Sequence, residues 1–204
     1  MWGRLRRLRL TGSNFGKVID AYDRNQTKGV PFPPSLFKSL KGEYKLDLKD
    51  SIMWGQMHEN VAFDAYIKET GNHVEKTGLH LFECGFLGSS PDGIIITPSG
   101  AKGVLEIKCP HKYRDVTVDQ MVKTVFATSN KKEKKDFFLK SDGSMYEKHP
   151  YWHQIQAEML ATGVQWADLA IWTLKDLKII HVLKDEQWKD HNIDPNCYMN
   201  TDGK

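Results

Sequence analysis

Residues 90–110 have the sequence SPDGIIITPSGAKGVLEIKCP, and this stretch decides the fold. Two apolar runs, at 93–97 and 103–109, are separated by a Pro-Ser-Gly turn signal, and a second turn signal precedes the first run. Short apolar runs bounded by turn residues are typical of β-strands. The sequence therefore predicts two neighbouring strands, the second folded back on the first.

The strand predicted at 103–109 has two different faces, because successive side chains of a strand point to opposite sides. Leu105, Ile107 and Cys109 would share an apolar face. Glu106 and Lys108 would share the other face, about 7 Å apart along the strand. An acidic and a basic side chain are thus expected side by side.

The fold-back also brings Asp92, at the mouth of the first strand, toward Glu106. Two carboxylates and a backbone carbonyl are the hard oxygen ligands that Mg²⁺ takes. Beside them, Lys108 could orient or deprotonate a water, or stabilise the charge that builds on a phosphate. From this stretch alone, a surface strand with an ordinary Glu–Lys pair is the alternative.

A helix is predicted at about 52–69, with Ala62, Phe63 and Tyr66 in its apolar stripe. Glu59 lies on the same side of this helix, and burying a charge there is costly without a cation or a partner. A metal ion would supply the cation. A core Arg or Lys is the alternative.

Two glutamines stand near the start of a later helix, which His149-Pro150 opens and Gly163 closes. Gln154 and Gln156 lie in the first turns of this otherwise amphipathic helix. Taken by themselves, both are also consistent with plain surface amides.

The chain as a whole has an α/β layout. Its 204 residues suffice for one domain with a sizeable core, and we expect a single domain over 1–204. The order of elements favours a mixed central β-sheet flanked by helices. The expected elements are a helix that begins at 11–13, a Gly/Pro- and Lys-rich connector over 28–50, the helix at 52–69, strands at 79–89, 93–97 and 103–109, a helix at 115–127, a polar excursion at 128–148 with Asp142-Gly143 as a hairpin turn, the helix from 150 to 163, strands at 166–173 and 177–183, and a short helix around Trp188.

The composition is ordinary for a soluble protein, with 40% hydrophobic and 27% charged residues. No apolar run reaches the roughly 18 residues that a membrane span needs, so we expect no membrane partner. The cysteines, Cys84, Cys109 and Cys197, form no CxxC pair. This scattered set argues for a reducing intracellular compartment, nucleus or cytoplasm, and against a disulfide framework or a zinc cluster.

Basic residues are concentrated in two places, although the net charge is only +3. Such clusters suit a polyanionic partner, and a solvated face is the alternative for the lysine run. The Arg-rich start could also be a targeting segment, which would indicate the mitochondrion. The clusters are Arg4, Arg6, Arg7 and Arg9, and Lys131, Lys132, Lys134 and Lys135.

Five motifs between residues 2 and 156 resemble those of a known family and follow the family's order along the chain. Ser90-Pro91-Asp92-Gly93 with Glu106-Ile107-Lys108-Cys109-Pro110 resembles the PD-(D/E)XK restriction-endonuclease-like core, in the variant typical of the lambda-exonuclease and YqaJ-type viral recombinase family. The other motifs are Trp2, Arg6 and Thr11-Gly12-Ser13, similar to the family's opening motif, Trp54-Gly55-x-x-x-Glu59-Asn60, similar to its helical Glu motif, and Tyr151-x-x-Gln154-x-Gln156, similar to its Gln-helix motif. His149-Pro150-Tyr151-Trp152, Trp166-Ala167-Asp168 and Trp172-Thr173 are similar to the versions in eukaryotic mobile elements and large viruses.

The resemblance implies a two-metal deoxyribonuclease. Asp92, Glu106 and the Ile107 carbonyl would bind two Mg²⁺ ions, for which Mn²⁺ could substitute, and Glu59 would be a metal or water ligand. One ion would lower the pKa of water, while the other would stabilise the leaving 3′-oxygen. Lys108 would activate the attacking water.

Other residues of the family motifs would position the water and the DNA end. Gln154 would orient the attacking water, with Tyr151 and Gln156 in support. A pocket for the 5′-phosphate would have counterparts in Arg6, Ser13, Ser90 and Arg114. Guanidinium groups, hydroxyls and a helix N-terminus all favour a phosphate.

The implied activity is a 5′→3′ exonuclease on linear double-stranded DNA with a 5′-phosphorylated end, acting in DNA recombination, replication or repair. The implied partners are a single-strand annealing protein and further copies of the chain. The phage enzyme's trimer is not assumed, because the excursion at 128–148 lengthens the distance in sequence from Arg114 to the Gln helix. Gly12 also departs from the Ala often found there, which loosens the helix start.

Two other functions stay open at this point. A structure- or sequence-dependent DNA endonuclease could use the same fold. A non-catalytic nucleic-acid-binding recombination protein could keep a decayed site, although intact Asp92, Glu106 and Lys108 weigh against decay.

Overall fold

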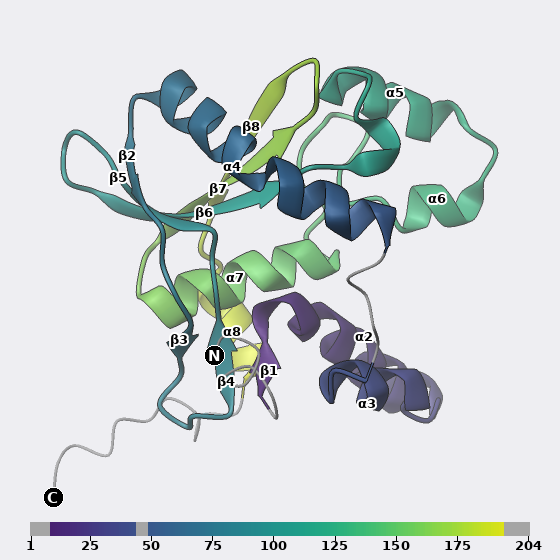
Figure 1. Ribbon diagram of the computed structural model, residues 1–204. Coiled ribbons are helices and arrows are strands. Elements are labelled where there is room, and N and C mark those ends of the chain that lie inside the picture. The colour runs from purple at the N-terminus through teal and green to yellow at the C-terminus, as the bar shows by residue number, and fades with distance from the viewer. Residues whose placement is uncertain (1–8, 44–48, 194–204) are drawn as a thin grey trace, which may run out of the picture.

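A five-stranded mixed sheet forms the centre of the computed structural model, which describes residues 9–43 and 49–193 (Figure 1). In the described ranges, β6 and β7 are parallel neighbours and the other neighbours in this sheet are antiparallel. The predicted mixed sheet is therefore confirmed. In spatial order the strands are β2 (His73–Glu75), β5 (Gly93–Ile96), β6 (Lys102–Lys108), β7 (Trp166–Trp172) and β8 (Leu177–Leu183).

Helices cover both faces of this sheet. Helix α4 (Asp50–Thr70) packs Phe63 and Tyr66 against Leu105 and Ile107 of β6. Helices α5 (Val118–Ala127) and α7 (Pro150–Thr162) pack on the opposite face, where Val104 of β6 joins the core. The alternation predicted for β6 is thus what divides the core into two layers.

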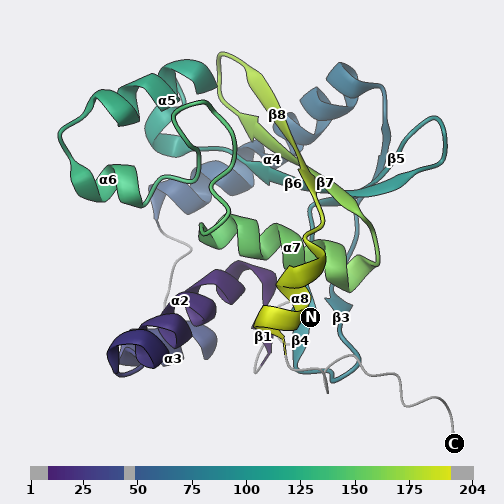
Figure 2. The ribbon, with the colours of Figure 1, turned by 180° about the vertical axis from the view of Figure 1, so that it is seen from behind.

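A smaller sheet lies beside the first, in the order β1 (Leu10–Thr11), β4 (Leu87–Ser89) and β3 (His80–Leu81). Helices α2 (Gly12–Lys28) and α8 (Glu186–Asn192) share a third core cluster with it, in which Phe15, Phe82 and Trp188 meet. Figures 1 and 2 show α7 between the five-stranded sheet and α2. Helix α7 therefore serves both parts of the fold.

Helices α2 and α7 approach so closely that only glycine fits between them at one point. A Cβ atom added at Gly16 would lie 2.4 Å from the Cα atom of Pro150. A Cβ at Gly12 would lie 2.4 Å from Oγ of Ser89. At Gly16 the neighbour is backbone, so glycine is a packing requirement there, which the sequence did not reveal. At Gly12 the neighbour is a hydroxyl that can rotate.

Several boundaries differ from those predicted. The connector over 28–50 contains a helix, α3 (Pro34–Leu40), whose Pro34 stands at the first helical position. The strand expected at 79–89 is two short strands, separated by a turn with Gly85 at φ 68°. The helix expected at 115–127 begins later, as α5, which Thr117 caps. A 3-10 turn, η1 (His111–Tyr113), lies before the predicted range. None of the helices in the described ranges is long and apolar enough to span a bilayer.

The excursion at 128–148 is less polar in its packing than predicted. It contains a short helix, α6 (Lys131–Lys135), and the predicted turn at Asp142-Gly143, where Leu139 and Met145 form an isolated antiparallel bridge. Leu139 and Met145 are buried in the same cluster as α5 and α7, together with Phe137 and Phe138. The excursion is part of the core, because its apolar run at 137–139 is buried while its lysines stay nearer the surface.

Candidate active site

The β5–β6 hairpin places Asp92 beside the backbone of β6. Its backbone N–H donates to the Leu105 carbonyl at 3.0 Å, and its Oδ2 accepts from the Ile107 N–H at 2.7 Å. This arrangement follows from the antiparallel register, in which Gly93 stands opposite Leu105. The predicted approach of Asp92 to β6 is confirmed.

Glu106 is buried, with 3% of its surface exposed. Its Oε1 accepts from Nζ of Lys108 at 2.5 Å and from Nε2 of Gln154 at 2.6 Å. The alternative of an ordinary surface Glu–Lys pair is therefore wrong. Helix α7 supplies the cover, since Gln154 lies on it and is itself buried rather than a surface amide.

Glu158 is a second buried carboxyl that the sequence reasoning missed. It lies one turn after Gln154 on α7 and is 1% exposed. The same Gln154 Nε2 that donates to Glu106 also donates to Oε1 of Glu158 at 2.9 Å, while Oε2 has no partner among the described residues. The available signal was the spacing of four from Gln154, which puts both side chains on one helix face.

The two hydrogen bonds of Gln154 fix the orientation of its amide. Both partners are carboxylate oxygens, so the NH₂ group faces Glu106 and Glu158, and the carbonyl oxygen faces elsewhere. Gln154 therefore holds Glu106 directly. Any water that Gln154 orients would have to donate to its carbonyl oxygen.

Burial, reinforced by the repulsion between neighbouring carboxyls, changes the protonation of Asp92 and Glu158. Burial, followed by the nearby Glu106 carboxylate, raises the pKa of Asp92 to about 8, against the opposing effects of Lys108 and the Ile107 N–H. For Glu158, burial and then Glu106 raise the pKa well above its usual value. A site that keeps buried carboxyls protonated lacks positive charge, and a divalent cation would supply it.

Lys108 is held as an ammonium ion. Burial alone would lower its pKa, but Glu106, Tyr151 and Asp92 together raise it above the ordinary value. Its Nζ also lies 4.3 Å from the centroid of the Tyr151 ring. As an ammonium ion, Lys108 can stabilise negative charge but has no lone pair with which to accept a proton.

Asp92, Glu106 and Lys108 line a polar cavity of about 310 Å³, which lies between α4 and the end of β6. Glu59 of α4 is exposed and lines this cavity, so the inference that its carboxylate is buried on the apolar face is wrong. Among the described residues, no group of three or more His, Cys, Asp and Glu side chains could hold a metal ion. Asp92, Glu106 and the Ile107 carbonyl offer oxygen atoms of the kind that Mg²⁺ takes, and all three residues line this cavity.

Of the two supporting residues, only one lies in the cavity. Tyr151 lines it, beside Lys108. Gln156 is buried elsewhere: it donates to the Leu183 carbonyl at 3.0 Å and accepts from the Asp185 N–H at 2.8 Å. Gln156 therefore ties the end of β8 to α7 and does not reach the metal ligands.

The described candidates for the 5′-phosphate pocket stand on three separate parts of the chain and share no hydrogen bond with one another. Ser13 is exposed in the first turn of α2, and Ser90 has a buried Oγ without a partner in the described ranges. Arg114 instead donates to the His111 carbonyl at 2.9 Å and lies 5.7 Å from the Trp54 ring centroid. Arg6 lies outside the described residues.

Comparisons with known proteins give a consistent answer. The family model of the YqaJ-like viral recombinase domain matches residues 1–165. The alkaline nuclease of Autographa californica nuclear polyhedrosis virus is 26% identical over 136 residues, which cover 60% of this chain and 31% of that protein. The chain thus spans about a third of the length of this curated relative.

Solved structures share the fold. The structure of LHK-Exo in complex with dAMP has a TM-score of 0.63 and 20% identity, with 93% of this chain and 85% of the other covered. The alkaline exonuclease LHK-Exo from Laribacter hongkongensis has a TM-score of 0.61 and 19% identity, with 93% and 84% covered. At these identities the likeness shows the fold, here that of PD-(D/E)XK-like exonucleases.

Proposed function

Because this chain belongs to the family of YqaJ-like viral recombinase domains, we propose that it is a Mg²⁺-dependent DNA exonuclease that digests linear duplexes in the 5′→3′ direction. The names of its relatives, an alkaline nuclease and an alkaline exonuclease, support a DNA-hydrolysing enzyme. We further propose that 1–204 forms one nuclease domain, with two ions per site and Mn²⁺ able to replace Mg²⁺. An intracellular location stays a prediction.

The observation that carries this proposal is the convergence of Asp92, Glu106 and Lys108 in one polar cavity, with Gln154 behind Glu106. Asp92, Glu106 and the Ile107 carbonyl would hold the cation. A divalent cation bound there would act as a Lewis acid and lower the pKa of a coordinated water. Lys108, as an ammonium ion, would stabilise the negative charge that develops on the phosphate.

The 5′→3′ direction rests on a separate observation. Ser13 stands in the first turn of a 17-residue helix, where backbone N–H groups favour an anion. The buried Ser90 Oγ, two residues before Asp92, has no partner in the described ranges. A solved structure of the same fold is a complex with dAMP, a deoxynucleoside monophosphate. Both features support a site for a terminal phosphate.

The test follows end-labelled DNA with Mg²⁺ and compares duplexes that carry a 5′-phosphate with duplexes that carry a 5′-hydroxyl. We expect faster digestion of the phosphorylated ends and no cutting of closed circles. Cutting of circles would indicate an endonuclease instead, and DNA binding without any cleavage would indicate a non-catalytic recombination protein.

The site assignment is tested with Glu106→Gln and Lys108→Met. We expect each to lower cleavage at least about a hundredfold, while DNA binding in EDTA is retained. The matched control is Lys102→Met, at the exposed start of the same strand. Full activity of either site variant would disprove the assignment.

A further inference from the structure

A second cavity, of about 700 Å³, lies beside the candidate active site. The excursion at 128–148 forms most of its wall, and Asp20 of α2 forms part of the other side. Its volume falls in the range of ligand pockets, roughly 300–1,000 Å³. We call it the lysine cavity, after Lys134, Lys135, Lys140 and Lys148 in its lining.

Positive charge predominates around this cavity. Four lysines line it against two acidic residues, Asp20 and Asp136. Lys140 pairs with Glu147 at 3.6 Å. In the described ranges, Lys134, Lys135 and Lys148 form no ion pair. The surplus of unpaired ammonium groups suits an anionic ligand.

Aromatic rings form much of the remaining wall. Tyr146 is 43% exposed, and the His149 ring lies in the same lining. Burial lowers the pKa of His149 to about 4, so this ring is neutral at physiological pH and offers a face rather than a charge. Flat rings between ammonium groups match a ligand that alternates bases with phosphates.

An aromatic wall joins the lysine cavity to the active-site cavity. Phe137 lines the former and Phe138 the latter, and their ring centroids are 5.2 Å apart. His149, on the lysine side, packs at 4.8 Å from Tyr151, which lies beside Lys108. A nucleic-acid strand that crosses this wall would pass directly from one cavity to the other.

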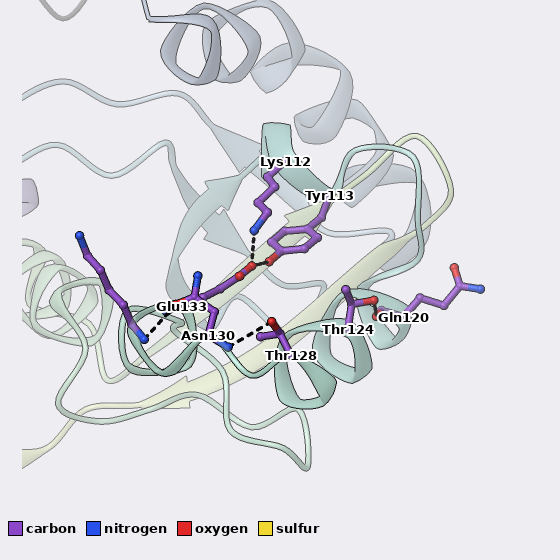
Figure 3. A network of polar contacts seen from close by, with 8 residues as sticks. Lys112, Tyr113, Gln120, Thr124, Thr128, Asn130 and Glu133 are labelled. Atoms are coloured by element: carbon purple, nitrogen blue, oxygen red, sulfur yellow. Dashed lines mark hydrogen bonds and ion pairs between the residues drawn. The ribbon is translucent and has the colours of Figure 1, made fainter.

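Helix α6, which carries two of the lysines, is held in place. Its Glu133 accepts hydrogen bonds from Nζ of Lys112 and the hydroxyl of Tyr113, just after the Glu106–Lys108 strand (Figure 3). The side chain of Asn130 caps its first turn. A fixed helix loses less entropy on binding than a free loop would.

We propose that the lysine cavity binds single-stranded nucleic acid, with phosphates on the lysines and bases stacked on Tyr146 and His149. Paired bases cannot open their faces to protein rings, so a single strand fits these walls better than a duplex does. This goes beyond the proposed nuclease activity, because it gives the excursion a binding role of its own. An acidic protein segment is the competing occupant.

The test measures fluorescence anisotropy of a labelled oligothymidylate with the full chain in EDTA, which prevents cleavage. In Lys135→Glu/Lys148→Glu, we expect affinity for the single strand to fall at least about tenfold. We also expect the slope of log affinity against log salt to shrink by about 1.4, which corresponds to two phosphate contacts. Tyr146→Ala should weaken binding about tenfold, and Tyr146→Phe should restore it, because base stacking needs only the ring.

The matched control is Lys68→Glu/Lys102→Glu, which changes the net charge equally. These two exposed lysines lie at the end of α4 and in the β5–β6 hairpin, on the opposite side of the molecule from α6 in Figure 1. We expect this control to stay within about twofold of the unmodified protein. Equal losses in the control, or equal losses of duplex and single-strand affinity, would overturn the proposal, and so would polyglutamate binding without oligothymidylate binding.

Hydrolysis of bis(p-nitrophenyl) phosphate with Mn²⁺ separates this proposal from the proposed function. The small ester can reach the metal ligands without touching the lysine cavity, so its hydrolysis should be unchanged in Lys135→Glu/Lys148→Glu. Absence of hydrolysis in the unmodified protein would count against the nuclease, whereas the anisotropy result in EDTA would still decide the binding site.

Discussion

The carboxyl of Asp92 shows how one residue can couple metal, proton and fold. Its pKa is raised to about 8 by burial and by Glu106, so it carries a proton at neutral pH in the metal-free protein. The unfolded chain releases that proton near pH 4, so the folded state binds the extra proton between these values. The free energy of unfolding of the metal-free protein should therefore fall as pH rises from about 4 to 8.

Metal binding should release the same proton from Asp92. Because Asp92 must lose it to become a ligand, the apparent dissociation constant for Mn²⁺ should fall about tenfold per pH unit below pH 8 and level off above. Calorimetry in two buffers of different ionisation enthalpy measures the proton released on binding. Asp92→Asn should remove the proton release, and pH-independent affinity in the unmodified protein would contradict the assignment.

Glu158 contributes to the pH dependence in the same direction. Burial and the Glu106 carboxylate raise its pKa well above 4.5, so folding retains a proton that the unfolded chain loses. Glu158→Gln keeps the shape and an acceptor for Gln154 but does not titrate. We expect little change in the free energy of unfolding near pH 4 and a clear gain at pH 8. Urea unfolding at both pH values measures this, and parallel curves for the two proteins would argue against a protonated Glu158.

At the scale of elements, the contact between α2 and α7 holds the small sheet beside the five-stranded sheet. The backbone of Pro150 leaves no room for a side chain at Gly16, whereas nothing lies within 4 Å of a Cβ at Gly55 in α4. Both glycines stand inside helices. They therefore form a matched pair in which helix propensity is the same and packing differs.

Gly16→Ala should destabilise the protein by about 1–3 kcal/mol, because overpacking at fixed backbone outweighs propensity. Gly55→Ala should stabilise it by roughly 0.5–1 kcal/mol, because alanine loses less entropy in a helix. Thermal and urea unfolding measure both. A stabilised Gly16→Ala variant would mean that α2 and α7 do not pack so closely.

At the scale of the whole molecule, the excursion at 128–148 belongs to the core. Leu139 is 2% exposed in the cluster that also contains α5 and α7, while Lys131 of the same excursion is exposed. Leu139→Ala should cost about 2–5 kcal/mol through the cavity it leaves. Lys131→Ala should change the free energy of unfolding by less than about 0.5 kcal/mol. Equal, small effects would mean that the excursion is a detachable surface loop.

Much of the fold followed from local pattern. The hairpin around Asp92 and Glu106 and the helix that Pro150 opens and Gly163 closes are both confirmed, because turn residues and caps act over a few residues. Short segments were harder to predict from the sequence. The three-residue strand at His73–Glu75 was missed, because three residues cannot establish a period.

The sequence by itself determined which chemistry-bearing residues share a face of β6, since alternation along a strand is local. The tertiary structure decided what surrounds them. Helix α7 buries Glu106 and adds Glu158, whereas Glu59 stays exposed at the cavity wall. Burial depends on how elements distant in sequence pack together, and no local pattern encodes this. The charge balance of the site, and with it the protonation of Asp92, is therefore a property of the packed molecule.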